Sequence, residues 1–463
     1  MKRIFIPILF FILACTFAAC QASPDIAPIV DKKDILTEPE DQAVSPEHSE
    51  YPSVWNEQIE HEGKALNILV DAAVAAPDAS IYPIQEIKPA EFEQETVDNV
   101  IHYFIGDNKL YNQDTPFTKS QIEQMIVEAK ENLNRADDPD AGLPSKEALE
   151  NYISNLEQMY LTAPDNTQND AISTALQFNP ETGNKALYAR SDLGKKDAAW
   201  INVISSPNAD FPSLFSFSDG LLYQPDTALY GKQAKGLSTS VSDAEKITES
   251  LLQELGFTDM VVSRVETGYN SNPSADSIGK LPQGYIVYCC RQANGIPVKL
   301  YELEQTQASL DYTSKWKDQD ITVMVDDTGV TSFCLISYGK TGRILQGNAQ
   351  LLPFAEIQRI FRKNIFYKYA ALDEFLSHID ETQYDENMVM TASCAIIIDN
   401  IALGYITLPQ KDNIEGFMLV PAWFFYGYTE NTLTDGTIER QYLGSGTATC
   451  KMIINAVDGS IVS

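Results

Sequence analysis

The chain has 463 residues, of which 65 are acidic and 33 basic, so its formal net charge is −32 at pH 7. A surface this acidic repels phosphate groups, which argues against nucleic acid as a partner and against broad basic docking to anionic lipid. Apolar residues make up 44% of the chain, enough for two or three packed domains of roughly 100 to 200 residues each.

The first twenty residues have the order of an export signal. Lys2 and Arg3 precede a largely apolar run at 4–14, and small residues stand directly before Cys20. The run is shorter than the roughly 20 apolar residues that cross a bilayer. We expect residues 1–19 to be a lipoprotein signal peptide and Cys20 to carry lipid after cleavage.

Lipid on Cys20 would hold the protein at the extracytoplasmic face of the cell membrane, because two acyl chains anchor a protein stably. Two alternatives stay open. One is an uncleaved segment that serves as a signal anchor, and the other is cleavage at Cys15, after Ile12-Leu13-Ala14.

Residues 20–50 are acidic, contain four prolines and have no aromatic side chain. Such a segment cannot bury enough apolar surface to offset its chain entropy, so it predicts a tether.

Residues 51–235 predict a helix-rich N-terminal α+β region. Local patterns indicate a strand at 66–74 and helices at 90–105, 118–134 and 145–161. Thr118 with Gln121 three residues later is a capping box, which marks a helix start. Residues 173–235 read as short strands and loops that bridge to the C-terminal half.

The C-terminal half reads as a duplicated helix-plus-sheet unit, at 236–345 and 346–463. In both units a helix is followed by three strands. The first strand ends in Gly-Tyr, the second begins with Gly and an aromatic residue, and the third leads into a turn that contains an acidic residue and Gly. Unit one has a helix from Ser242, with Glu245 completing its cap, and strands at 260–269, 284–291 and 321–325. Unit two has a helix at 354–363 and strands at 390–406, 416–426 and 452–457. The predicted fold class is α+β, with antiparallel sheets each packed with a helix. A chance parallel between the units is the alternative.

Short motifs in these units resemble the PepSY-type and YycI-type modules of bacterial envelope proteins. The matching segments are 292–298, 326–329, 401–405, 419–423 and 455–459. The whole chain resembles a group of uncharacterised clostridial-type lipoproteins, the DUF6034 group.

The resemblance implies a regulatory role. YycH/YycI-type proteins restrain a cell-wall sensor kinase through contacts that include their own transmembrane helix, and this chain departs there, because no later apolar run reaches spanning length. PepSY-type modules also occur in protease propeptides, which implies peptidase inhibition as a second role.

Motifs for catalysis are weak. No nucleophile elbow, phosphate loop or dinucleotide fingerprint occurs, and His48, His61, His102 and His378 lie too far apart in sequence for a zinc motif. Ser314 with Lys317, and Lys340-Thr-Gly342, match motifs of penicillin-interacting enzymes, but too few residues separate them. We expect no catalytic residue, no metal and no cofactor.

Five cysteines follow Cys20, several of them inside apolar runs: Cys289, Cys290, Cys334, Cys394 and Cys450. Buried free thiols are the expectation and a disulfide the alternative.

The run Trp423-Phe-Phe-Tyr426 suggests a binding surface. In a strand, alternation places Trp423 and Phe425 on one face and Phe424 and Tyr426 on the other. Phe424 and Tyr426 are the candidate surface for a peptide or glycan, and a sheet packed on both faces is the alternative.

We therefore expect a lipid-anchored, extracytoplasmic, non-catalytic binding or regulatory protein that acts on an envelope protein. The alternatives are an envelope hydrolase or peptidase inhibitor, and a solute-binding lipoprotein with two α/β lobes of parallel sheets.

Overall fold

The computed structural model describes residues 51–60, 66–136, 145–166, 171–191, 199–219, 223–225, 233–270, 283–299, 302–303, 316, 318–377, 391–410, 413–441 and 449–462. The predicted signal peptide, Cys20 and the tether lie outside the described residues. So do Cys15, Ser314, Lys317 and three of the four histidines.

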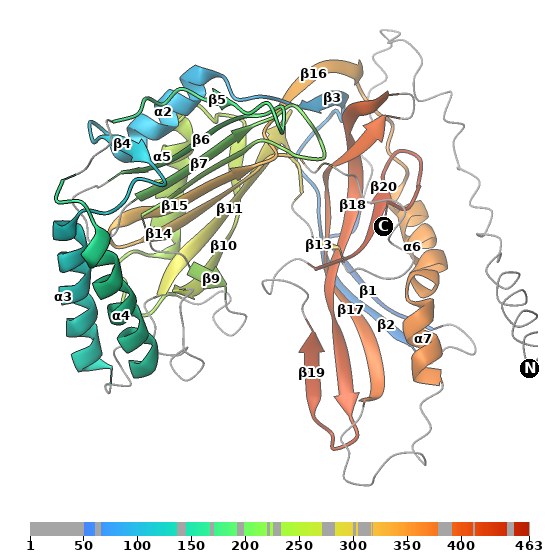
Figure 1. Cartoon of the computed structure of the whole chain (residues 1–463). Coiled ribbons are helices and arrows are strands. Elements are labelled where there is room, and N and C mark those ends of the chain that lie inside the picture. The colour runs from blue at the N-terminus through green and yellow to red at the C-terminus, as the bar shows by residue number, and fades with distance from the viewer. Residues whose placement is uncertain are drawn as a thin grey trace, which may run out of the picture.

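Two sheets stand side by side (Figure 1). The first has nine strands: β1 (Val54–Ile59), β2 (Asn67–Ala75), β3 (Ile84–Pro89), β13 (Glu302–Leu303), β16 (Gly339–Gln346), β17 (Thr391–Gln410), β18 (Asn413–Leu433), β19 (Ile438–Gln441) and β20 (Thr449–Asn455). Its main order is β1-β2-β17-β18-β20-β13, with β3 and β19 also on β18, and β16 on β3.

The second sheet has eleven strands: β4 (Leu110–Asn112), β5 (Gln177–Phe178), β6 (Lys185–Ser191), β7 (Ala199–Ser205), β8 (Leu214–Ser218), β9 (Tyr223–Pro225), β10 (Met260–Asn270), β11 (Gln283–Ala293), β12 (Ile296–Pro297), β14 (Asp320–Asp326) and β15 (Gly329–Ile336). Its main order is β4-β6-β7-β8-β15-β14-β11-β10-β9, with β5 beside β6 and β12 beside β11.

The expected α+β class is confirmed. Strand pairings are antiparallel apart from β2 with β17 and β13 with β20. The sheets are therefore not the parallel-stranded lobes that the solute-binding alternative predicts.

Each sheet has helices on one face. On the second sheet, α2 (Gln94–Ile105) and α5 (Val241–Glu254) bury their apolar stripes against alternate residues of β6, β7, β11, β14 and β15. On the first sheet, α6 (Phe354–Lys368) packs on β1, β17 and β18, with Phe361 stacked on Phe425 at 4.5 Å, and α7 (Ala370–Ser377) follows it. Two further helices, α3 (Lys119–Arg135) and α4 (Lys146–Thr162), form a hairpin with its own small core.

Residues of the predicted N-terminal region 51–235 are divided between the two sheets. Strands β1 to β3 belong to the first sheet, where β2 pairs with β17, and β4 to β9 belong to the second. The interpretation of 173–235 as a bridge is wrong, because β6, β7 and β8 are integral strands of the second sheet. The pairing of β8 with β15, more than 100 residues further along the chain, cannot be predicted from the local sequence pattern.

The two C-terminal units share a topology. In unit one, α5 precedes β10, β11 and β14, which pair in that order, and in unit two, α6 precedes β17, β18 and β20, which do the same. Gly268 and Gly404 both lie where another segment of backbone passes closely, which leaves no room for a side chain. A Cβ atom at Gly268 would stand 2.3 Å from the Gln224 carbonyl oxygen, and one at Gly404 would stand 2.9 Å from the Pro297 carbonyl oxygen. The predicted start of the unit-one helix is two residues late, since the cap is Ser240 with Asp243.

The sheets are joined where the chain crosses between them. β3 leads from the first sheet into α2, and β15 leads from the second sheet into β16, so both crossings meet where Pro89 pairs with Gly339. A third crossing follows β12, where Lys299 N–H donates to the Tyr405 carbonyl oxygen at 3.0 Å. An apolar cluster seals this joint: Ile87, Ala293, Ile296, Val298, Trp316, Tyr405, Phe417 and Leu419.

Candidate functional site

Phe424 and Tyr426 do not form an exposed surface. They lie on the face of β18 opposite α6, as alternation predicts, but Phe424 is 0% and Tyr426 7% exposed. They pack with side chains of β17 and β20 that include Ile406 and Ile453. The candidate binding surface is therefore core, because this strand is covered on both faces.

The cysteines do not form a reactive site in the described residues. All five described cysteines are free, and four of them are buried. Burial raises the pKa of the Cys290 and Cys334 thiols to about 11 and that of Cys450 to about 12, so at neutral pH they are protonated and poor nucleophiles. The expectation of buried free thiols holds for all but Cys334, which is half-buried.

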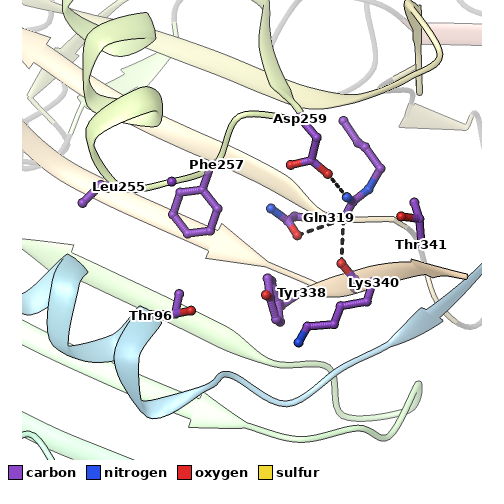
Figure 2. A pocket seen from close by; sticks show the side chains of 11 residues that line it. Thr96, Leu255, Phe257, Asp259, Gln319, Tyr338, Lys340 and Thr341 are labelled. Atoms are coloured by element: carbon purple, nitrogen blue, oxygen red, sulfur yellow. Dashed lines mark hydrogen bonds and ion pairs between the residues drawn. The ribbon is translucent and has the colours of Figure 1, made fainter.

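A polar pocket lies beside the joint between the sheets (Figure 2). It has a volume of about 300 Å³. Its walls come from the first turn of α2, the segment between α5 and β10, the end of β11, the start of β14 and the start of β16. The lining side chains that matter most are Phe257, Asp259, Arg291, Gln319, Tyr338 and Lys340. We call this the Arg291 pocket.

Arg291 is the buried charge of this pocket, with its side chain 4% exposed. Its Nε–H donates to both oxygens of Asp318, at 3.0 and 3.3 Å, and Nη1 donates to Asp259. Nη2 donates to Gln319 Oε1 at 3.0 Å and to the Gly339 carbonyl oxygen at 2.7 Å. The guanidinium thus ties the ends of β11 and β14 to the crossing strand β16.

Asp318 is the deepest carboxylate of the site, 2% exposed. Burial raises the pKa of its carboxyl, and the adjacent Arg291 guanidinium opposes that rise. A buried pair of this kind is costly to break from one side, because the remaining charge has no water around it.

The mouth of the pocket carries a second, exposed ion pair. Lys340 pairs with Glu93, which stands just before α2, and the two side chains are 44% and 66% exposed. Tyr338 lines the pocket between this pair and the core, and its ring stacks on Phe92 at 4.8 Å. Lys340 is also the first residue of the Lys340-Thr-Gly342 segment noted in the sequence.

A second feature is the face of the second sheet turned away from α2 and α5. Pairing aligns one row of residues across seven strands: Tyr188, Asn202, Ser216, Cys334, Thr322, Tyr288 and Arg264. Every member is exposed or half-exposed, and Tyr188 reaches 47%. We call this row and its neighbours Ile204, Leu214 and Ile336 the open face.

One end of the open face is held in a fixed geometry. The Arg264 guanidinium lies 4.1 Å from the Tyr288 ring centre, and its Nε–H donates to Glu266 at 2.9 Å. Tyr288 also donates its hydroxyl to Glu266, at 3.2 Å. The row therefore combines an aromatic and cationic end with hydroxyl and amide side chains in its middle, a mixture typical of protein-binding surfaces.

Across the described part of the chain, no group of three or more His, Cys, Asp or Glu side chains is placed to hold a metal ion. No described helix combines the length and apolarity needed to cross a bilayer.

No family model and no curated protein matches the chain. A solved structure of an uncharacterised protein from Eubacterium rectale ATCC 33656 is similar over 94% of this chain and 99% of its own, at 12% identity and a TM-score of 0.43. A similarity this weak assigns no function, and the likeness to PepSY-type and YycI-type modules stays a prediction.

Sequence reasoning missed both the pocket and the open face. A usable signal for the pocket was Arg291 itself, a lone charge that directly follows the apolar run of β11 and must find partners if buried. Asp259 lies 32 residues before Arg291, and its other partners lie 27 to 48 residues after it. The residues next to Arg291 in the sequence therefore could not identify its partners.

Proposed function

We propose that the chain is a lipid-anchored, extracytoplasmic binding or regulatory protein that acts on an envelope protein through the open face of the second sheet. The observation that carries the proposal is this face: a half-exposed row, aligned across seven strands, of aromatic, hydroxyl, amide and cationic side chains. Tyr and Arg are enriched in protein interfaces, which supports a protein partner.

The anchor is supported by the N-terminal pattern that ends at Cys20. The predicted antiparallel, helix-backed units give a rigid surface on which alternate side chains have fixed positions, as binding requires. The alternatives of an envelope hydrolase and a peptidase inhibitor remain, but no specific contact of the described residues favours either.

A photocrosslinking amino acid placed at Tyr188 or Ile336 in the full chain tests the surface, because both side chains are exposed on the open face. We expect a crosslink to one envelope protein in living cells. The matched control is the same probe at Glu249, an exposed position of α5 on the other side of this sheet. Equal crosslinking at Glu249, or none at either open-face position, would count against the proposal.

The anchor is tested separately by Cys20→Ser. We expect the variant to leave the membrane fraction, and full retention there would contradict lipid attachment at this residue.

A further inference from the structure

We propose that the Arg291 pocket binds a small zwitterion of the size of a single amino acid, with its ammonium group at Asp259 and its carboxylate group at Lys340. This inference is independent of the anchor and of the envelope partner. At about 300 Å³ the pocket is at the small end of ligand sites, which suits one residue-sized molecule.

The first element is a carboxylate with one oxygen available. The Asp259 side chain is 46% exposed and lines the pocket. Its Oδ2 accepts from Arg291, and its Oδ1 has no hydrogen-bond donor among the described residues. An ammonium group has three N–H donors, so it can use Oδ1 without displacing Arg291.

The second element is an ammonium group whose present partner is easy to exchange. Lys340 pairs with Glu93, and both side chains are largely in water. Such exposed pairs contribute little to stability, so a ligand carboxylate can share or replace Glu93 at little cost.

The third element is a set of donors between these two groups. Gln319 Oε1 accepts from Arg291, which leaves the Gln319 amide N–H groups to donate elsewhere. One of the two Nη1 hydrogens of Arg291 likewise has no acceptor in the described residues. Figure 2 shows Asp259 and Lys340 on opposite sides of Gln319, so the ends of a ligand would meet opposite charges.

The charges of the site favour a zwitterion over an ion of one sign. Two cations, Arg291 and Lys340, alternate with three carboxyl groups, Asp259, Asp318 and Glu93. A zwitterion can place its ammonium group beside a carboxylate and its carboxylate group beside a cation, whereas an ion of one sign can use only one of these two contacts. The rings of Phe257 and Tyr338 add an apolar wall for a short side chain.

Titration calorimetry on the full-length chain in detergent tests this. The probes are the protein amino acids and D-alanine, one at a time, with propionate and ethylamine as molecules that carry only one of the two charges. We expect at least one amino acid to bind with about tenfold or higher affinity than either single-charge probe. Asp259→Asn and Lys340→Gln should each weaken that binding by about tenfold or more.

Lys130→Gln is the matched control, because Lys130 is an exposed lysine that pairs with Glu157 on the α3–α4 hairpin. It should leave the affinity unchanged. Asp259→Asn keeps an oxygen for Arg291, and if it nevertheless fails to fold, the exposed Lys340→Gln decides. The proposal is overturned if no amino acid binds at millimolar concentration, if propionate or ethylamine binds as tightly, or if the folded pocket variants keep full affinity.

Discussion

The two C-terminal units have the same order of helix and strands but differ in what covers their sheets. In unit one, the strands β10, β11, β14 and β15 are covered by α5 on one face and contribute half-exposed residues to the open face on the other. In unit two, β18 is buried on both faces: α6 packs on one side, and on the other Phe424 and Tyr426 are buried beside side chains of the neighbouring strands β17 and β20. The same topology therefore leaves a partly accessible row of side chains in unit one, beside the buried Glu266 and Ile286, and a closed core in unit two.

In both units, the segment just before the helix is hydrogen-bonded to the segment that follows the third strand, but the acceptor differs. After β14, the Asp327 carboxylate accepts from the backbone N–H groups of Ser238 and Thr239, just before α5. After β20, the Ala456 carbonyl oxygen accepts from Leu352 N–H at 2.8 Å, just before α6. Unit one thus depends on a side chain, whereas unit two depends on backbone geometry.

The largest test of the difference in burial is Phe424→Ala. Because Phe424 is fully buried in unit two, removing its ring should lower the free energy of unfolding by about 3–5 kcal/mol. Tyr188→Ala on the open face is the matched change, with an expected loss within about 0.5 kcal/mol. Urea unfolding of both variants measures this, and equal losses would show that the two faces are equally buried.

Arg291→Gln tests the buried Arg291–Asp318 pair beside the joint between the two sheets. It should lower the free energy of unfolding by about 3–5 kcal/mol at neutral pH, because Asp318 would remain buried without its cation. Burial raises the folded-state pKa of Asp318, so the folded state binds the extra proton more readily than the unfolded state, and the loss should shrink as the pH falls toward 4. Unfolding curves at several pH values measure this, and a loss that stays constant with pH would argue against a charged Asp318 in the variant.

Ser240→Ala tests the side-chain cap at the start of α5, which has no counterpart at the start of α6. Ser240 caps α5 together with Asp243, whereas α6 begins at Pro353 without a side-chain cap. We expect a loss of about 0.5–2 kcal/mol, because one helix N–H loses its acceptor. Thermal unfolding measures it, with Ser250→Ala, an exposed position of the same helix, as the control.

Asp327→Asn should have the smallest effect and acts locally. Hydrogen bonds from Ser238 and Thr239 hold the pKa of the Asp327 carboxyl at about 2. A carboxyl with a lowered folded-state pKa stabilises the fold above its unfolded value and loses that effect as the pH falls from about 4 to about 2. The protection of the Ser238 and Thr239 amides, measured as their exchange rate relative to the intrinsic rate at the same pH, should therefore fall in this window. In the variant this protection should be low already at neutral pH, whereas protection at Leu352 in unit two should not change.

Local chemistry determined several elements nearly to the residue. The helix predicted at 118–134 is observed as α3, because the capping box of Thr118 and Gln121 satisfies its first backbone donors wherever the helix lies in the fold. The strand predicted at 66–74 is β2 for the same kind of reason, since its alternation is a property of the segment. The order of helix and strands within each unit and the burial of most thiols could also be predicted from the sequence.

Tertiary structure alone decided which segments meet. The residues around Ile68 in the sequence do not indicate that it pairs with Ile396. Those around Arg291 do not indicate that it bonds to Asp318 and Gly339. Alternation put Phe424 and Tyr426 on one face, but whether that face is solvent or core depends on what packs over it. Local hydrogen bonds and periodicity act within a few residues, whereas burial and charge pairing are settled by the whole packed chain.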